Sequence, residues 1–119
     1  MLGAWNSQDG NRLAALMAQD GTYEDVAVGQ TMDRESIVDL IARTHTLSSD
    51  HRLEWMAKQR SGNDYAAEWL MSGINDGPAP ELGLEATGKP FAVRGASVGQ
   101  LDERGLIKVH RDYWNLLAS

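Results

Sequence analysis

Residues 89–115 place the strongest constraint on how this chain folds, because they form two alternating runs on either side of a tight turn. Apolar and polar side chains alternate through residues 91–98 and again through 106–114, which is typical of half-buried strands. Between the two runs, the Asp-Glu-Arg-Gly string predicts a turn in which Gly105 is free to adopt a positive φ. The sequence therefore predicts two long strands joined by a short connection.

The second of these strands carries an unusual set of polar residues on one face. His110 and Asp112 share that face with Trp114 and with Lys108, while Ile107 is expected on the opposite face. Burying a carboxylate among aromatic side chains is costly in free energy unless it is hydrogen-bonded. Asp112 is therefore either a solvated charge or part of a functional site.

The rest of the chain predicts two helices and three further strands. Helices are expected over residues 10–18 and 34–45, and strands over 22–26, 51–60 and 64–73. Asp9 and Asp33 are the expected N-caps of the two helices. Residues 74–88 contain Pro78 and Pro80, so we expect a long, poorly ordered loop at the pocket mouth or at a dimer edge. Helices followed by antiparallel strands predict an α+β fold, with helices on one face of a curved sheet.

Composition limits the classes of function. The 119 residues are enough for a single domain spanning 1–119. Eleven basic against seventeen acidic residues give a formal net charge of −6, which argues against nucleic acid as a partner. The sequence lacks an apolar run of membrane-spanning length, a signal-peptide pattern and cysteine, so we expect no membrane partner and a cytoplasmic location. His45, His51 and Glu54 do not have a metal-ligand spacing, and we expect neither a metal nor a cofactor.

Several strings resemble, in the same order, those of the nuclear-transport-factor-2-like superfamily and, within it, the SnoaL-like polyketide cyclase group. The strings are Tyr23-Glu24-Asp25, Asp33-Arg34-Glu35-Ser36-Ile37, Ala67-Glu68-Trp69, Ala86-Thr87-Gly88-Lys89-Pro90-Phe91 and Arg111-Asp112-Tyr113-Trp114-Asn115. The resemblance extends over nearly all of the chain from Trp5 onward. It implies a cone-shaped, curved antiparallel sheet that wraps around N-terminal helices and encloses an apolar pocket. The first helix of the family is expected to be shortened in this chain.

The resemblance also implies catalytic roles for four residues. Asp112 matches the general base on the last strand of SnoaL-like cyclases, and also the water-activating Asp of limonene epoxide hydrolase. Tyr23 matches a water-holding Tyr of that hydrolase, while Asp25 resembles the proton-shuttling Asp of ketosteroid isomerase. His110 shares the face of Asp112, so it is expected to tune that carboxylate or to act as an acid.

Some residues depart from these relatives. Glu68 and Leu70 stand where the epoxide hydrolase needs an Arg and a second Asp, which disfavours epoxide opening. Ser97 replaces the protonated Asp of ketosteroid isomerase, which disfavours that isomerisation. The residues expected to line the pocket are Met17, Trp55, Glu68, Leu70, Val93, Ser97 and Trp114.

Two classes of function stay open at this point. The first is a small cofactor-free enzyme that abstracts a proton next to a carbonyl, or activates water, on an apolar small molecule. The second is a non-catalytic module of the same fold for ligand binding or dimerisation. In that second case Asp112 is expected to pair with Arg111, with Lys108 or with a backbone amide. A homodimer is expected through the outer face of the sheet, where Trp69, Arg94 and Val98 would otherwise leave a mixed apolar patch in water.

Overall fold

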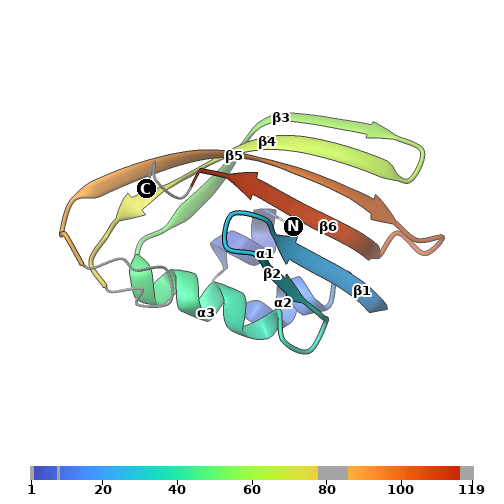
Figure 1. Ribbon diagram of the computed structural model, residues 1–119, viewed down its shortest axis with the longest axis horizontal. Coiled ribbons are helices and arrows are strands. Elements are labelled where there is room, and N and C mark those ends of the chain that lie inside the picture. Colours follow the sequence, from blue (N-terminus) through green and yellow to red (C-terminus); the bar gives the residue numbers. More distant parts are fainter. Residues whose placement is uncertain (1, 8, 78–85, 116–119) are drawn as a thin grey trace.

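The computed structural model describes residues 2–7, 9–77 and 86–115, which form three helices and six strands (Figure 1). In chain order these are α1 (Leu2–Asn6), α2 (Gly10–Ala14), β1 (Met17–Asp25), β2 (Gln30–Met32), α3 (Val38–Leu47), β3 (Arg52–Ser61), β4 (Asp64–Ile74), β5 (Pro90–Leu101) and β6 (Ile107–Trp114). Among these described elements, no helix is long and apolar enough to cross a membrane.

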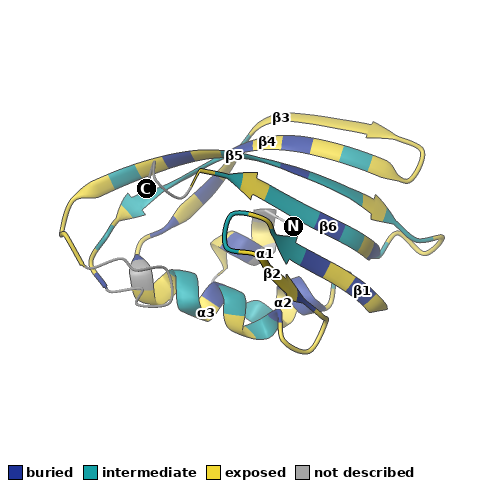
Figure 2. Ribbon diagram, in the orientation of Figure 1, coloured by how far each residue is buried: buried dark blue, intermediate teal, exposed yellow. Residues whose placement is uncertain are grey.

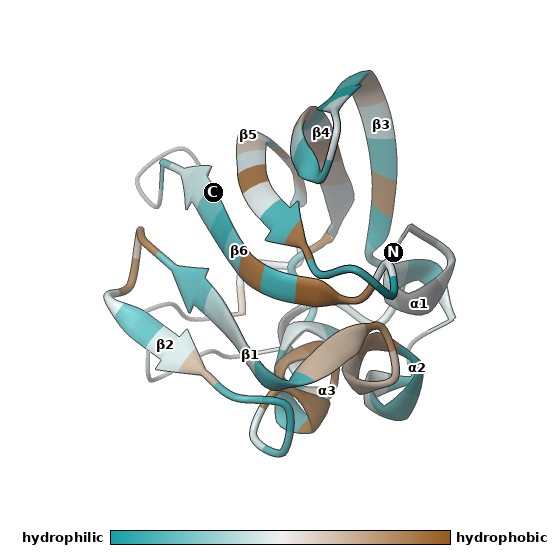
Figure 3. Ribbon diagram, turned by 90° about the vertical axis from the view of Figure 1, so that its right-hand side faces the viewer, coloured by the Kyte–Doolittle hydropathy of each residue, from teal (hydrophilic) through white to brown (hydrophobic). Residues whose placement is uncertain are grey.

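The six strands form one curved, unclosed sheet in the order β2-β1-β6-β5-β4-β3. The sheet arches over the three helices, which all lie on its concave side (Figure 1), and the end-on view shows the strands curling around them (Figure 3). The predicted α+β class with a curved sheet is confirmed. The expectation of a purely antiparallel sheet is wrong at one pair, because β1, the second strand of the sheet, lies parallel to β6, the third.

The predicted pair of C-terminal strands is present as β5 and β6. The connection between them turns at Gly105, whose φ is 80°. The pairing then skips a residue, since Leu101 lies opposite Ile107 but Gln100 lies opposite Val109. This bulge leaves Ile107 buried and Lys108 exposed, so the alternation expected at the start of β6 is wrong. Beyond the bulge the alternation holds, and His110 is turned toward the helices.

The N-terminal elements differ from the predicted ones in extent. Asp9 does cap α2, accepting a hydrogen bond from the backbone of Asn11, but this helix ends at Ala14. The helical spacing of apolar residues continues to Met17, yet β1 begins there because pairing with β6 outweighs local propensity. α1 and β2 were not predicted.

The second predicted helix also begins later than expected, at Val38. The Asp33 carboxylate accepts a hydrogen bond of 2.7 Å from the backbone of Ser36, which stabilises a turn ahead of α3 rather than its first turn. Strands β3 and β4 confirm the predicted hairpin within one residue at each end. Pro78 and Pro80, on which the loop prediction depends, lie outside the described residues.

The hydrophobic core lies between the helices and the concave face of the sheet (Figure 2). It includes Leu13 from α2, Met17 and Tyr23 from β1, and Ile37 and Ile41 around α3, all at most 1% exposed. The distal half of the β3–β4 hairpin extends past these helices, and β3 is exposed over most of its length (Figure 2). The hairpin therefore has one end anchored in the core and one end open to solvent.

Candidate active site on the concave face

Strand register brings five of the predicted site residues together on the concave face. In the parallel pair of β1 and β6, Tyr23 lies opposite His110 and Asp25 lies opposite Asp112. In the antiparallel pair of β5 and β6, Ser97 lies opposite Asp112. Residues that are distant along the sequence therefore become neighbours through backbone pairing alone.

The Asp112 carboxylate lies at the centre of a hydrogen-bonded cluster that we call the Asp112 cluster: Tyr23, Ser97, His110 and Asp112. Its Oδ2 accepts a hydrogen bond of 2.6 Å from the Tyr23 hydroxyl. Its Oδ1 accepts one of 2.5 Å from the Ser97 hydroxyl and lies 2.6 Å from Nε2 of His110. The Asp112 side chain is only 13% exposed. Each carboxylate oxygen thus has at least one partner in place of water.

These contacts decide the protonation state of Asp112. Burial by itself raises a carboxyl pKa, but here the hydrogen bond from His110, the charge of His110 when it is protonated, and the hydroxyls of Ser97 and Tyr23 lower the pKa of Asp112 below its ordinary value. Burial, reinforced by the nearby Asp112 carboxylate, raises the pKa of the Tyr23 hydroxyl well above its ordinary value. At neutral pH the cluster therefore contains an ionised Asp112 and a protonated Tyr23.

His110 connects this carboxylate to another tyrosine. Its ring is 1% exposed and stacks on Tyr23, with ring centroids 4.3 Å apart and planes 26° apart. An ionised carboxylate only accepts hydrogen bonds, so Nε2 of His110 must carry a proton toward Asp112. Nδ1 lies 2.5 Å from the hydroxyl of Tyr65 on β4. When the imidazole is neutral, Nδ1 accepts a hydrogen bond from the Tyr65 hydroxyl. When it is protonated, Nδ1 donates a hydrogen bond to the Tyr65 oxygen.

Two glycines of β5 create the space for the aromatic rings of β4. A Cβ added at Gly99 would lie 2.3 Å from the Tyr65 hydroxyl oxygen, and one added at Gly95 would lie 2.2 Å from the Trp69 ring. Trp69 is 8% exposed, and its indole N–H donates a hydrogen bond of 2.8 Å to the Ser97 hydroxyl. The expectation that Trp69 lies on the outer face is wrong. It instead orients the serine that bonds to Asp112.

Asp25 lies next to the Asp112 cluster but has different surroundings. Its Oδ1 accepts a hydrogen bond of 2.7 Å from the indole N–H of Trp114. Burial raises the pKa of Asp25; the Trp114 bond opposes this effect, whereas the charge of Asp112 adds to it. Asp25 is thus the more easily protonated carboxyl of the pair.

An open groove of about 490 Å³ borders the far end of this face, beside the β3–β4 hairpin. Its apolar lining comes from Leu16, Trp55, Tyr65, Ala67, Leu101 and Ile107. Lys58, Gln59 and Arg60 of β3 also line it. Tyr65 is the residue shared by the groove and the hydrogen-bonded network of His110.

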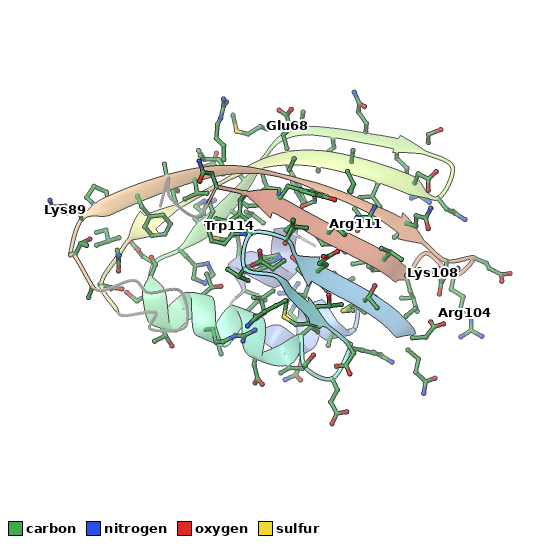
Figure 4. All side chains as sticks on the ribbon, in the orientation of Figure 1. Glu68, Lys89, Arg104, Lys108, Arg111 and Trp114 are labelled. Atoms are coloured by element: carbon green, nitrogen blue, oxygen red, sulfur yellow. The ribbon has the colours of Figure 1, made fainter. Side chains whose placement is uncertain are left out.

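The remaining residues expected in the pocket are divided among three locations. Trp55 lines the groove, while Met17 and Val93 are buried in the core at 0% and 5% exposure. Glu68 is exposed and extends from the convex side of the sheet (Figure 4), so its predicted place in the pocket is wrong. Leu70 follows Glu68 by two residues on β4 and shares that outer face.

The alternatives considered for the polar residues can also be compared with the structure. Among the described residues, the basic side chain that contacts the Asp112 carboxylate is His110, which is charged only when protonated, and neither Arg111 nor Lys108 bonds to this carboxylate. His45 and His51 lie edge to face with ring centroids 6.1 Å apart. Within the described parts of the chain, no group of three or more His, Cys, Asp or Glu side chains could hold a metal ion.

The residue missed from the sequence is Tyr65. Alternation along β4 places its side chain on the same face as that of Trp69, but nothing local distinguishes it from a packed aromatic residue. The signal was the glycine at position 99, since a glycine inside a strand often marks the close approach of another group. Recognising it requires the register in which Gly99 lies between Tyr65 and His110.

Comparison with known proteins agrees with the fold described above. The family model described as a SnoaL-like domain matches residues 1–110. A hypothetical protein of ketosteroid isomerase-like fold from Catenulispora acidiphila, solved in complex with trimethylamine, is 30% identical, with a TM-score of 0.83 over 98% of this chain and 83% of that one. TsrD from Streptomyces laurentii is 26% identical, with a TM-score of 0.82 over 98% and 84% of the two chains.

IdmH from Streptomyces antibioticus, described as a candidate polyketide cyclase, is 20% identical, with a TM-score of 0.82 over 98% of this chain and 88% of that one. At that identity the similarity shows the fold alone. A search of curated proteins finds no significant match.

Proposed function

The chain belongs to the SnoaL-like domain family, and from this premise we propose that it is a small cofactor-free enzyme of general acid–base chemistry. The reaction is the transfer of a proton next to a carbonyl group of an apolar small molecule, as in a cyclase or isomerase. The single observation that carries this proposal is the buried hydrogen-bonded pair of His110 and Asp112. A histidine whose Nε2 faces an ionised carboxylate can accept a proton at Nδ1, because the carboxylate stabilises the resulting imidazolium.

In this proposal Asp112 acts through His110. The carboxylate already accepts hydrogen bonds from Tyr23, Ser97 and His110, and its lowered pKa makes it a weak base toward a substrate C–H bond. Its role is to hold the imidazole in one tautomer and to stabilise its positive charge. Tyr23 and Ser97 fix the orientation of the carboxylate.

Water activation, as in epoxide hydrolases, has less support. Glu68 and Leu70, which stand where that chemistry needs an Arg and an Asp, are on the convex face and away from Asp112. Asp25 remains the second candidate carboxylate, because its raised pKa brings it closer to the range in which a carboxyl exchanges protons. We assign it a supporting role next to the Asp112 cluster.

Exchange of α-protons for deuterium in aryl ketones, followed by proton NMR in D₂O, tests the proposal. The wild-type protein should accelerate exchange, and Asp112→Asn should reduce the acceleration by about a hundredfold or more. Asp20→Asn, which changes an exposed carboxylate of β1, is the matched control and should leave the rate unchanged. No acceleration by wild-type protein, together with a ligand-induced rise in melting temperature, would favour the alternative of a non-catalytic ligand-binding module.

We also propose a homodimer formed through the outer face of the sheet. Tyr113 and Met56 are apolar residues of the sheet that are 44% and 48% exposed. Leu70 and Val98 of the outer face are only partly buried. Light scattering at a protein concentration of roughly tens of micromolar should give twice the chain mass of 13.1 kDa. A mass of one chain would contradict this assembly.

A further inference from the structure

We propose that the groove beside the β3–β4 hairpin is the substrate site, that it takes an apolar molecule carrying an anionic group, and that Tyr65 is the catalytic residue that exchanges the proton with that substrate. The proposal rests on the proposed function, since it names the substrate class and the residue through which the His110–Asp112 pair acts. It is carried by the location of Tyr65, which lines the groove and contacts Nδ1 of His110.

Access is the first reason to assign the chemistry to Tyr65. His110 is 1% exposed and Asp112 is 13% exposed, and neither belongs to the residues that line the groove. Tyr65 is partly buried and contacts both the groove and His110. Gly99 has no side chain, which leaves space for the Tyr65 ring to cross β5. A ligand in the groove therefore contacts Tyr65, which lies between the groove and the imidazole.

Protonation is the second reason. Burial, reinforced by the charge of Asp112, raises the pKa of Tyr65 above its ordinary value, so the free tyrosinate is disfavoured. A proton relay through the Tyr65 hydroxyl avoids forming the tyrosinate. When the substrate C–H bond breaks, its proton binds to the Tyr65 oxygen while the original hydroxyl proton moves to Nδ1 of His110.

This step is balanced without any additional reactant. The electron pair of the C–H bond stays on the substrate as an enolate, and neutral His110 becomes an imidazolium beside the ionised Asp112. Tyr65 is a neutral phenol before and after the step. In the reverse direction, the imidazolium returns its proton through Tyr65 to the enolate.

The charge of the groove indicates the substrate class. Of its lining residues, Lys58 and Arg60 are basic and none is acidic, although the whole chain has a formal net charge of −6. Among the described residues, neither of these two side chains forms an ion pair with a carboxylate. The Arg60 Nε donates a hydrogen bond of 2.8 Å to the carbonyl of Gly62, which holds this side chain close to the hairpin turn. Two unpaired cations beside an apolar lining are complementary to an apolar anion, such as an aryl carboxylate.

Binding of two matched fluorescent probes tests the site. Anilinonaphthalene sulfonate is apolar and anionic, whereas phenylnaphthylamine has the same aromatic rings without the charge. The double substitution Lys58→Gln and Arg60→Gln should weaken binding of the sulfonate by about fivefold and leave the neutral probe unchanged. Trp55→Ala should weaken both probes. Sulfonate binding that none of these substitutions alters would overturn the assignment of the groove.

Deuterium exchange at the α-carbon of benzoylpropionate, an aryl ketone with a carboxylate, tests Tyr65. Tyr65→Phe should reduce the enzyme-dependent rate by about a hundredfold while leaving sulfonate binding close to wild type. The matched control, Tyr113→Phe, removes an exposed hydroxyl on β6 and should keep the full rate.

The possible failures are distinguishable. Exchange that survives in Tyr65→Phe but is lost in Asp112→Asn would overturn the role of Tyr65 and leave the proposed function intact. Absence of exchange with wild-type protein would contradict the proposed function and the role of Tyr65 together. The probe measurements would still decide between the groove and another location for the ligand.

Discussion

Asp112 and Asp25 are direct neighbours in the pairing of β6 with β1, yet the pKa values of their carboxyl groups are shifted in opposite directions. The more deeply buried one, Asp112, has a pKa below its ordinary value, while the pKa of Asp25 lies above its own. The difference follows from the donors around each carboxylate. Asp112 accepts from three side chains, whereas the side-chain donor to Asp25 is Trp114.

The comparison shows that burial alone does not determine the protonation of a carboxyl group. Desolvation raises the pKa of both residues, and it prevails only where the hydrogen bonds are too few to offset it. The sheet supplies the donors to Asp112 from β1, β5 and β6 at once. Asp25, on the adjacent strand, lies at the edge of this network, and its pKa stays raised by burial.

The largest expected effect breaks the network at its centre. Asp112→Asn removes the charge and replaces one carboxylate oxygen by an NH₂ group, so at least one of the buried donors Tyr23, Ser97 and His110 loses its acceptor. We expect the free energy of unfolding to fall by about 3 kcal/mol, measured by urea denaturation at neutral pH. An unchanged or increased stability would mean that the cluster does not stabilise the carboxylate.

A smaller effect is expected from removing one donor and leaving the carboxylate in place. Tyr23→Phe deletes the hydroxyl bonded to Oδ2 of Asp112 and should lower the free energy of unfolding by about 2 kcal/mol, the usual range for a bond to a charged group. It should also raise the pKa of Asp112. Tyr113→Phe on the exposed face is the control, and equal losses in both variants would show that the hydroxyl of Tyr23 has no special role.

The smallest expected effect has the opposite sign. Asp25→Asn keeps an oxygen that accepts from Trp114 but removes a charge that is disfavoured by burial and by Asp112. We expect a small rise in the melting temperature at neutral pH, compared with Asp20→Asn as an exposed control. A fall in melting temperature would show that the charge of Asp25 is stabilised after all.

The part of the fold that follows from the sequence is the part governed by local alternation and turn residues. The β3–β4 hairpin and the turn at Gly105 are of this kind. The bulge at Lys108 and the early start of β1 are not, because the bulge depends on how β6 pairs with β5 and the start of β1 depends on how β1 pairs with β6. Pairing between strands that are some ninety residues apart has no local signature in a single sequence.

The candidate site divides in the same way. The alternation of β6 places His110 and Asp112 on one face, and resemblance to a family brings in Tyr23 and Asp25. The roles of Tyr65 and Gly99 depend on the register across β4, β5 and β6, and the position of Glu68 depends on which face of β4 is concave. These are tertiary facts, and the residues concerned carry no distinguishing local pattern.

The pH dependence of stability follows from the two pKa directions. With a folded pKa below the unfolded value of about 3.9, Asp112 contributes stability above that pH and loses it as the pH falls through its folded pKa. Asp25 contributes in the opposite sense, with stability that is present below about 3.9 and is lost as the pH rises through its raised folded pKa. The two effects therefore oppose each other in acid.

Titration of the side-chain carboxyl carbons by NMR, with both residues followed in one sample, tests this account most directly. The Asp112 signal should titrate below pH 3.9 and the Asp25 signal above it, with about 3.9 as the reference for an unperturbed Asp. Substitution of each residue by Asn assigns its signal. An Asp112 pKa at or above the reference value would contradict the claim that a buried, ionised carboxylate holds His110 ready to accept a proton.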